Sequence, residues 1–201
     1  MEKGQGRATA RTGGPRLPSH RMFALTDGVM AIAMTLLVLD IELPEGLSGR
    51  ALHDALDDVA SQVATFLLSA VVIALFWQAH HTALRGAEWL DARLFWLNVA
   101  FLVLVSLIPF PTRVLEAYAH LPLGPGLYGA VIGTAALVLY AMQRHIARSP
   151  AYGRGGRTPF PAQAFVFLLS VGIAPFSPQA ALYSWIASVP LSLLVDRRAA
   201  G

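Results

Sequence analysis

RMFALTDGVMAIAMTLLVLDIELP, residues 21–44, is an apolar run with an arginine at its start and an aspartate six residues further on. A membrane-spanning helix needs about 20 mostly apolar residues, and this run is long enough to form one. Asp27 lies too deep in the run to be a flanking charge, and a carboxylate inside a membrane is costly unless it has a partner or faces water. The stretch therefore predicts a first membrane span with a polar site on one face.

The composition supports an integral membrane protein. Hydrophobic residues make up 55% of the 201 residues and charged residues only 13%, whereas a soluble domain carries about 25% charged residues. The chain has no cysteine, so disulfides and thiolate metal sites are excluded. No nucleophile motif, metal-ligand set or phosphate-binding loop is visible, so we expect neither an enzyme nor a cofactor.

Five further apolar blocks give six candidate spans in all, and the basic residues indicate their orientation. Of the 15 Lys and Arg residues, all but Arg50 and Arg113 lie at the two chain ends or where the second span meets the third and the fourth meets the fifth. Because cytosolic segments are enriched in Lys and Arg, both termini are predicted to be cytosolic. The predicted spans are 21–42, 60–79, 93–112, 124–143, 159–175 and 179–195.

The segments outside the spans complete the predicted organisation. Residues 1–19 are rich in Gly, Arg and Pro and predict a disordered basic cytosolic tail, which we interpret as a topology signal and not as a nucleic-acid site. Residues 20–196 form the transmembrane domain and 197–201 a cytosolic C-terminal tail. The loop after the first span is acidic and should raise the local cation concentration. His53 and Asp57 have the spacing of a helical metal pair, but no metal site is predicted there.

Asp27 should find its partner on another helix. Arg21 lies about 120° around the helix from it and is not an i, i+3 or i, i+4 neighbour. At the same depth, polar side chains end the second span and begin the third, and an imidazole with amide, indole or hydroxyl donors would stabilise a buried carboxylate. The predicted polar clasp, which locks the first span against the next two, consists of Arg21, Thr26, Asp27, Trp77, His80, His81 and Asn98.

Two other interpretations of these residues stay open. The histidines can instead lie at the membrane interface while Asp27 faces a cytosolic vestibule. Alternatively, Asp27 and one histidine form a proton relay, since intramembrane ionisable groups often mark proton routes. Adjacent residues on a helix point about 100° apart, so His80 and His81 are not expected to bind a metal together.

Three segments carry a family resemblance: RMFALTD at 21–27, WQAHH at 77–81 and LFWLNVAFLVLVSLIPFPT at 94–112. Together they resemble the transmembrane protein 175 family, the endolysosomal potassium channels and their prokaryotic relatives. Members of that family carry Arg, three variable residues and Phe-Ser-Asp at the start of the first span. Here Leu25 stands in place of Phe and Thr26 in place of Ser, so the hydroxyl is kept and the aromatic ring is lost.

The resemblance implies a homotetramer of six-span channel subunits in the inner (plasma) membrane, with the first span of each subunit lining a central pore. By this analogy Ile32 forms the narrowest apolar ring, Leu36 and Leu39 extend it outward, and the hydroxyl of Thr35 can meet a partly dehydrated ion. No Thr-Val-Gly-Tyr-Gly segment is present, so selectivity would depend on an apolar constriction and its hydration cost.

The sequence thus predicts a potassium-permeable cation channel whose partners are potassium ions, further copies of the chain and the lipid bilayer. The alternative is a proton channel or proton-coupled transporter that uses Asp27 and a nearby histidine. A membrane enzyme or a scaffold is a third possibility, and no motif supports the enzyme.

Overall fold

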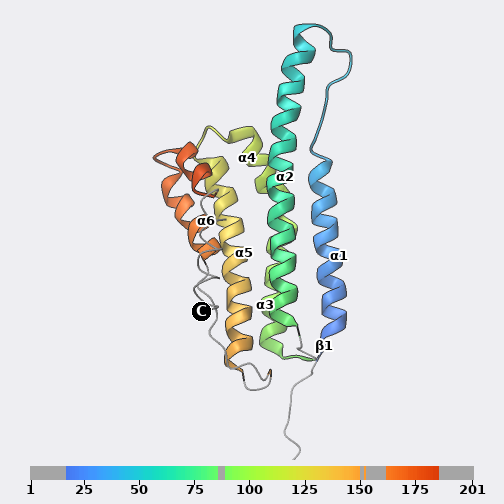
Figure 1. Cartoon of the computed structure of the whole chain (residues 1–201), viewed down its shortest axis with the longest axis vertical. Coiled ribbons are helices and arrows are strands. Elements are labelled where there is room, and N and C mark those ends of the chain that lie inside the picture. Colours follow the sequence, from blue (N-terminus) through green and yellow to red (C-terminus); the bar gives the residue numbers. More distant parts are fainter. Residues whose placement is uncertain (1–16, 86–88, 150–151, 153–161, 186–201) are drawn as a thin grey trace, which may run out of the picture.

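The chain is helical along almost all of the described length. The computed structural model describes residues 17–85, 89–149, 152 and 162–185, in which long helices run side by side (Figure 1). In chain order the elements are β1 (Leu17–Pro18), α1 (Ser19–Val38), α2 (Arg50–Leu84), β2 (Trp89–Leu90), α3 (Ala92–Leu107), α4 (Pro109–Tyr118), α5 (Leu123–Arg148), α6 (Ala162–Ile173) and a further helical segment at 178–185.

Within the described parts of the chain, four segments are long and apolar enough to cross a membrane, which supports the predicted class of helical membrane protein. They are Ser19–Val38, Arg50–Leu84, Ala92–Tyr118 and Leu123–Arg148. The predicted fifth and sixth spans are described only at 162–185, where both helical pieces are shorter. Their remaining residues, most of the predicted N-terminal tail and all of the C-terminal tail lie outside the described residues. The count of six spans therefore stays a prediction.

α1 buries one face and exposes the other. Its buried side chains recur every three or four residues, which is the spacing of one face of an α-helix, and they pack against α2 and α3. The opposite face carries large exposed apolar side chains. The buried set is Met22, Thr26, Met30, Ala33 and Leu37.

α2 is longer than the predicted second span. It has 35 residues and begins at Arg50, so residues 50–59, predicted as part of the outer loop, are helical. Hydropathy missed these turns because they carry Asp54, Asp57 and Asp58. At 1.5 Å per residue the helix is about 52 Å long, more than the roughly 30 Å of a hydrocarbon core. Its first turns rise above the other helices in Figure 1.

The predicted third span is two helices joined end to end. α3 ends at Leu107 and α4 begins at Pro109, whose ring lacks the N–H that would continue the helical ladder. The hydroxyl of Thr112 donates to the carbonyl of Ile108 over 2.8 Å, so this carbonyl at the junction has a partner. The helical run reaches Tyr118, six residues past the predicted end at 112.

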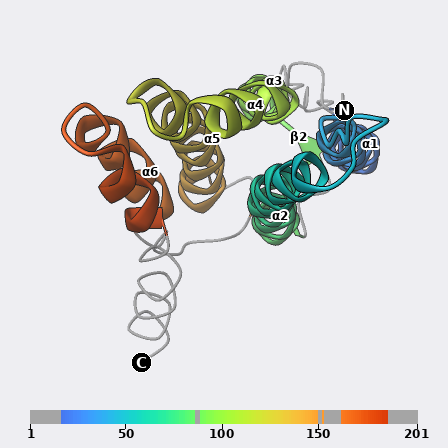
Figure 2. The same cartoon turned by 90° about the horizontal axis from the view of Figure 1, so that it is seen from above.

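α5 and α6 approach each other closely because glycine lies between them. A Cβ atom added to Gly129 would lie 2.5 Å from the Ser170 hydroxyl, and one added to Gly133 would lie 2.7 Å from Leu168 Cγ. Viewed from above, α1 lies at one edge of the bundle and α6 at the opposite edge, with α2 to α5 between them (Figure 2). No described element of this chain therefore covers the outer face of α1.

A short strap joins the lower ends of α1 and α3. β1, directly before α1, pairs antiparallel with β2, which lies two residues before α3, in the register Leu17 with Leu90 and Pro18 with Trp89. Leu17 and Pro18 fall within the predicted tail, but in the structure they belong to this strand pair. The strap thus fixes where α1 begins relative to α3.

Candidate functional site

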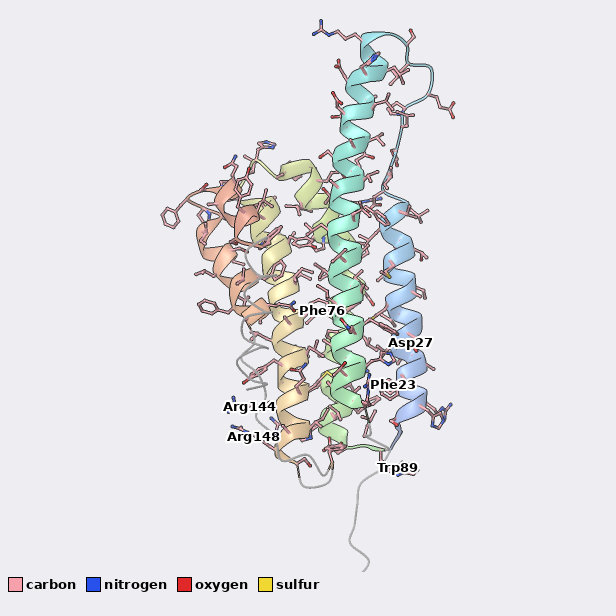
Figure 3. The ribbon with its side chains drawn as sticks, viewed as in Figure 1. Phe23, Asp27, Phe76, Trp89, Arg144 and Arg148 are labelled. Carbon is pink, nitrogen blue, oxygen red and sulfur yellow. The ribbon has the colours of Figure 1, made fainter. Side chains whose placement is uncertain are left out.

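Asp27 has two partners on α2. The Trp77 indole Nε1 donates to Asp27 Oδ1 over 2.8 Å, and His81 Nε2 donates to the same oxygen over 2.9 Å. Trp77 and His81 are four residues apart, so both side chains lie on one face of α2. Phe23, one turn before Asp27, stacks on the His81 ring at 5.0 Å between centroids. Figure 3 shows Phe23 and Asp27 on the side of α1 that faces α2.

The carboxylate is paired but not enclosed. The Asp27 side chain is 49% exposed and that of His81 is 30% exposed in the single chain. The pairing is the contact that a clasp requires, and the exposure leaves the carboxylate accessible as a vestibule requires, so the two interpretations are compatible and both stay predictions.

His80 belongs to a second, fully buried pair. Its Nε2 donates to Asn98 Oδ1 over 2.6 Å, and its ring stacks on Phe101 at 5.6 Å with an interplanar angle of 6°. This pair joins α2 to α3 and does not bond to Asp27. Thr26, buried against the same helices, makes no hydrogen bond within the described residues. The predicted clasp is therefore divided into an exposed α1–α2 pair and a buried α2–α3 pair.

Arg21 takes no part in either pair. It is exposed, and no ion pair to Asp27 is found among the described residues. The separation of six residues on one helix explains why the two charges do not meet, and the predicted place of Arg21 in the clasp is not seen among the described contacts.

The predicted pore residues lie on the uncovered face of α1. Ile32, Leu36 and Leu39 are 60%, 44% and 67% exposed. The Thr35 hydroxyl is also exposed but donates to the carbonyl of Ile32 over 2.9 Å, so it offers lone pairs and not a proton to the surroundings. Such a face on a membrane helix must be covered by lipid, by another copy or by the contents of a pore.

Sequence reasoning missed two contacts at the outer end of α1. The Arg113 guanidinium on α4 donates to Asp40 Oδ1, directly after α1, and the backbone N–H of Glu42 donates to Gln62 Oε1 on α2 over 2.8 Å. From the sequence, Arg113 is only one of the two basic residues outside the predicted cytosolic segments. Its lone position in an acidic region was the one signal that pointed to a carboxylate partner.

A second missed cluster lies at the other end of the bundle. Asp91 caps α3 by accepting from the backbone N–H of Leu94 over 2.7 Å, and it also accepts from His145 Nε2 over 2.6 Å. Its backbone N–H donates to the Tyr152 hydroxyl. Partial burial alone would raise the pKa of Asp91, but these hydrogen bonds outweigh it and hold the pKa below its usual value. An Asp directly before an apolar helical run is a recognisable N-cap signal.

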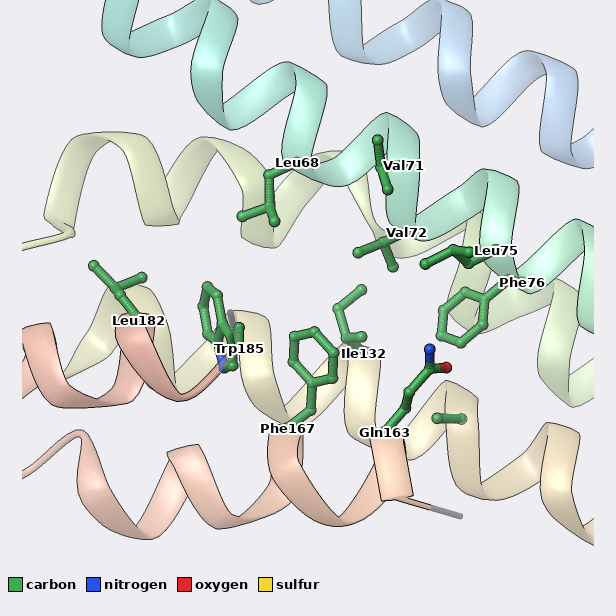
Figure 4. Close-up of a pocket in the computed structure, with 11 residues that line it drawn as sticks. Leu68, Val71, Val72, Leu75, Phe76, Ile132, Gln163, Phe167, Leu182 and Trp185 are labelled. Atoms are coloured by element: carbon green, nitrogen blue, oxygen red, sulfur yellow. The ribbon is translucent and has the colours of Figure 1, made fainter. Parts of the chain in front are cut away.

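One cavity has an apolar lining, and Asp27 is not among the residues that line it. It has a volume of about 420 Å³ and lies between α2, α5, α6 and the segment 178–185 (Figure 4). Gln163 points into it, and no charged side chain is among its lining residues. It offers no ligand set for a cation. Among the described residues there is also no group of three or more His, Asp or Glu side chains that could hold a metal.

Comparisons with known proteins agree on one family. The family model for the endosomal/lysosomal potassium channel TMEM175 matches residues 21–109. A potassium channel of Streptomyces collinus is 31% identical over 172 residues, covering 78% of this chain and 82% of the relative. The endosomal/lysosomal proton channel TMEM175 of Rattus norvegicus is 25% identical over 114 residues, which cover 55% of this chain and 22% of that longer protein.

A solved structure supports the same assignment. The crystal structure of a lysosomal potassium-selective channel TMEM175 homolog from Chamaesiphon minutus matches with a TM-score of 0.72 and 25% identity, covering 88% of this chain and 97% of that one. The expected absence of enzyme activity is confirmed, because this is a family of ion channels. The chain belongs to the TMEM175 family.

Proposed function

We propose that the chain is a subunit of a potassium-permeable cation channel in which α1 lines the ion path. The observation that carries the proposal is the exposed apolar face of α1 at Ile32, Leu36 and Leu39, on a helix whose other face is packed against α2 and α3. The bacterial relatives named above as potassium channels support the choice of ion.

One chain contributes one copy of α1, so a pore along this helix needs several copies of the chain around an axis. A closed ring with cyclic symmetry places the same face of each subunit toward the centre. We propose a homotetramer of six-span subunits in the plasma membrane with both termini cytosolic, in accordance with the alternation of basic residues. The proposed partners are potassium ions, the other subunits and the bilayer.

The bonds to Asp27 would fix the rotation of α1 about its own axis. Asp27 lies five residues before Ile32, about 140° away around the helix at 100° per residue. With Asp27 held against Trp77 and His81, Ile32 points away from α2. The role proposed for the clasp is therefore to orient the apolar face of α1 toward the ion path, and not to bind the permeating ion.

Selectivity in this proposal comes from dehydration. A ring of Ile32 side chains offers no oxygen ligand, so an ion passes only at the cost of part of its hydration shell, and a smaller, more strongly hydrated ion loses more. The lone pairs of Thr35, three residues further on, would partly compensate. Such a constriction should favour K⁺ over Na⁺ only moderately and can close by losing its water.

Potassium flux in liposomes tests the proposal. Ile32→Asn should raise K⁺ conductance or lower the K⁺ over Na⁺ ratio, because an amide lines the ring in place of an alkyl group. Val103→Asn is the matched control: Val103 is 63% exposed but lies on α3, so this variant should leave both quantities unchanged. If folded Ile32→Asn protein behaves like Val103→Asn protein in both measurements, the constriction is not at Ile32.

A proton channel is the second candidate, and the Asp27–His81 contact favours it. The pair is half exposed and 2.9 Å apart, which suits a site that exchanges protons, and the rat relative is named a proton channel. Proton flux that is lost in Asp27→Asn protein while K⁺ flux persists would support this function. Potassium flux that needs no pH gradient, together with a proton flux unaffected by Asp27→Asn, would exclude it.

A further inference from the structure

The outer end of α1 is held by contacts that the proposed function does not use. α1 ends at Val38, and Asp40 follows within one turn. Asp40 lies three residues after the buried Leu37 and is itself mostly buried, so it continues the packed face of the helix. Its carboxylate receives the guanidinium of Arg113 from α4.

A second contact supports the same end from another direction. Two residues after Asp40, the backbone N–H of Glu42 donates to the Gln62 side chain on α2 over 2.8 Å. The chain leaving α1 is thereby tied to α4 through a charge pair and to α2 through an amide. Both ties lie on the packed side of α1.

Leu39 lies on the other side of this junction. It directly precedes Asp40 and is 67% exposed. Neighbouring positions on a helical turn point about 100° apart, so a carboxylate held toward α4 directs the preceding side chain toward the uncovered face. A shift of the Asp40 backbone would move Leu39 with it.

We propose that the Asp40–Arg113 ion pair is a positioning pair that sets the place of Leu39 at the outer mouth of the ion path. The inference rests on the proposed channel function and adds two residues to it, neither of which contacts the ion. The pair joins α1 to a helix 73 residues away in sequence, so the outer part of α1 follows α4.

Arg113 can also act through its charge alone, and the two roles predict different results. A positioning role requires both partners, so Asp40→Asn and Arg113→Gln should change channel behaviour in the same direction. A purely electrostatic role gives opposite signs, because the first variant leaves a cation near the mouth and the second leaves an anion. Exchange of the two residues restores the contact in the positioning case.

The experiment measures the position of Leu39 directly. The chain has no cysteine, so Leu39→Cys provides a single site for a nitroxide label, and dipolar spectroscopy of the assembled protein in nanodiscs reports distances between labels on different subunits. Potassium and sodium permeabilities are measured on the same backgrounds without the label. The variants are Asp40→Asn, Arg113→Gln and the exchange Asp40→Arg with Arg113→Asp.

Matched controls remove the same charges elsewhere on the outer side. Asp57→Asn and Arg50→Gln alter exposed residues in the first turns of α2, which rise above the other helices. They should leave the label distances and the permeability ratio unchanged. They therefore correct for a general change of surface charge.

The positioning role predicts one narrow distance distribution in the otherwise native protein and a broader one in each single variant. The K⁺ over Na⁺ ratio should change about two- to fivefold in the same direction in both variants, which corresponds to the free energy of a partly exposed ion pair. The exchange variant should restore both readouts. If the label distances are unchanged and the two single variants change the permeability ratio in opposite directions, the pair acts through its charge and the proposal is overturned. If neither the distances nor the ratio changes, the pair has no positioning role and the proposal is overturned as well.

Failure of the channel proposal has a different signature. Labels that show no dipolar coupling in the otherwise native protein would mean that Leu39 residues do not meet around an axis, and they would overturn both the pore arrangement and the role of the pair. A native distance peak that persists unchanged in Asp40→Asn and Arg113→Gln protein overturns only the positioning role.

Discussion

Replacing Asn98 by Leu should destabilise the protein more than its small change in volume suggests. Asn98 Oδ1 accepts from His80 Nε2 over 2.6 Å, and both residues are fully buried. His80 Nδ1 already lacks a hydrogen-bond partner within the described residues. Asn98→Leu would leave both ring nitrogens of a buried imidazole without a partner.

The expected cost follows from the unsatisfied group. Leaving a buried polar group without a partner costs about 1–3 kcal/mol, whereas hydrogen bonds between membrane helices average only about 0.6 kcal/mol in double-mutant cycles. The larger range applies here, because the His80 side chain is fully buried and stacks on Phe101. We expect Asn98→Leu to lower the free energy of unfolding by about 2 kcal/mol.

The assay is a double-mutant cycle in detergent micelles, followed by unfolding with a denaturing detergent. His80→Leu should cost a similar amount, and the double variant should cost less than the sum, because neither polar group is then left buried alone. Ser106→Ala is the control: its hydroxyl bonds to Leu102 of its own helix, so its loss should cost under about 0.5 kcal/mol. Additive single costs, or an Asn98→Leu cost equal to that of the control, would refute the reasoning.

Three further predictions concern other contacts. Trp77→Phe removes one of the two donors to Asp27 and should lower stability by about 1 kcal/mol, measured as a lower midpoint of thermal unfolding; an unchanged midpoint would show that the indole bond contributes nothing. Hydrogen bonds keep the pKa of Asp91 below its usual value. The stability that the ionised Asp91 contributes should therefore be complete above about pH 4 and disappear as the pH falls through the folded-state pKa. In acid titrations of unfolding, Asp91→Asn protein should lack this pH-dependent loss of stability. Gly129→Leu should prevent close packing of α6 on α5 and cost roughly 3 kcal/mol. Gly172→Leu on α6, where an added Cβ meets no atom within 4 Å, should express and unfold like the native protein.

The sequence indicated that Asp27 needs a partner on another helix, and depth along the spans pointed to the region of Trp77 and the two histidines. It could not decide between His80 and His81. The two side chains point about 100° apart, and which of them meets α1 depends on the rotation of α2. In the structure His81 contacts Asp27, and His80 is packed between Asn98 and Phe101.

Helix limits were predictable only where hydropathy changes at the limit. Hydropathy assigns the acidic first turns of α2 to a loop because their side chains are polar, although the backbone is helical from Arg50. The interruption at Pro109 lies inside an uninterrupted apolar run, so hydropathy gave a single span. Contacts such as Asp40 with Arg113 and Asp91 with His145 join residues more than 50 positions apart and leave no local pattern.

The strap of β1 and β2 restricts the movements available to α1. Residues along a helix repeat every 1.5 Å or so, whereas residues along a strand repeat every 3.3 Å or so. A piston-like slide of α1 by one helical residue would therefore misalign the pairing of Leu17 with Leu90 and of Pro18 with Trp89. Movements that preserve the pairing of β1 with β2 are tilting of α1 about its lower end and rotation about its own axis. The strap therefore permits α1 to tilt but opposes its translation along the helix axis.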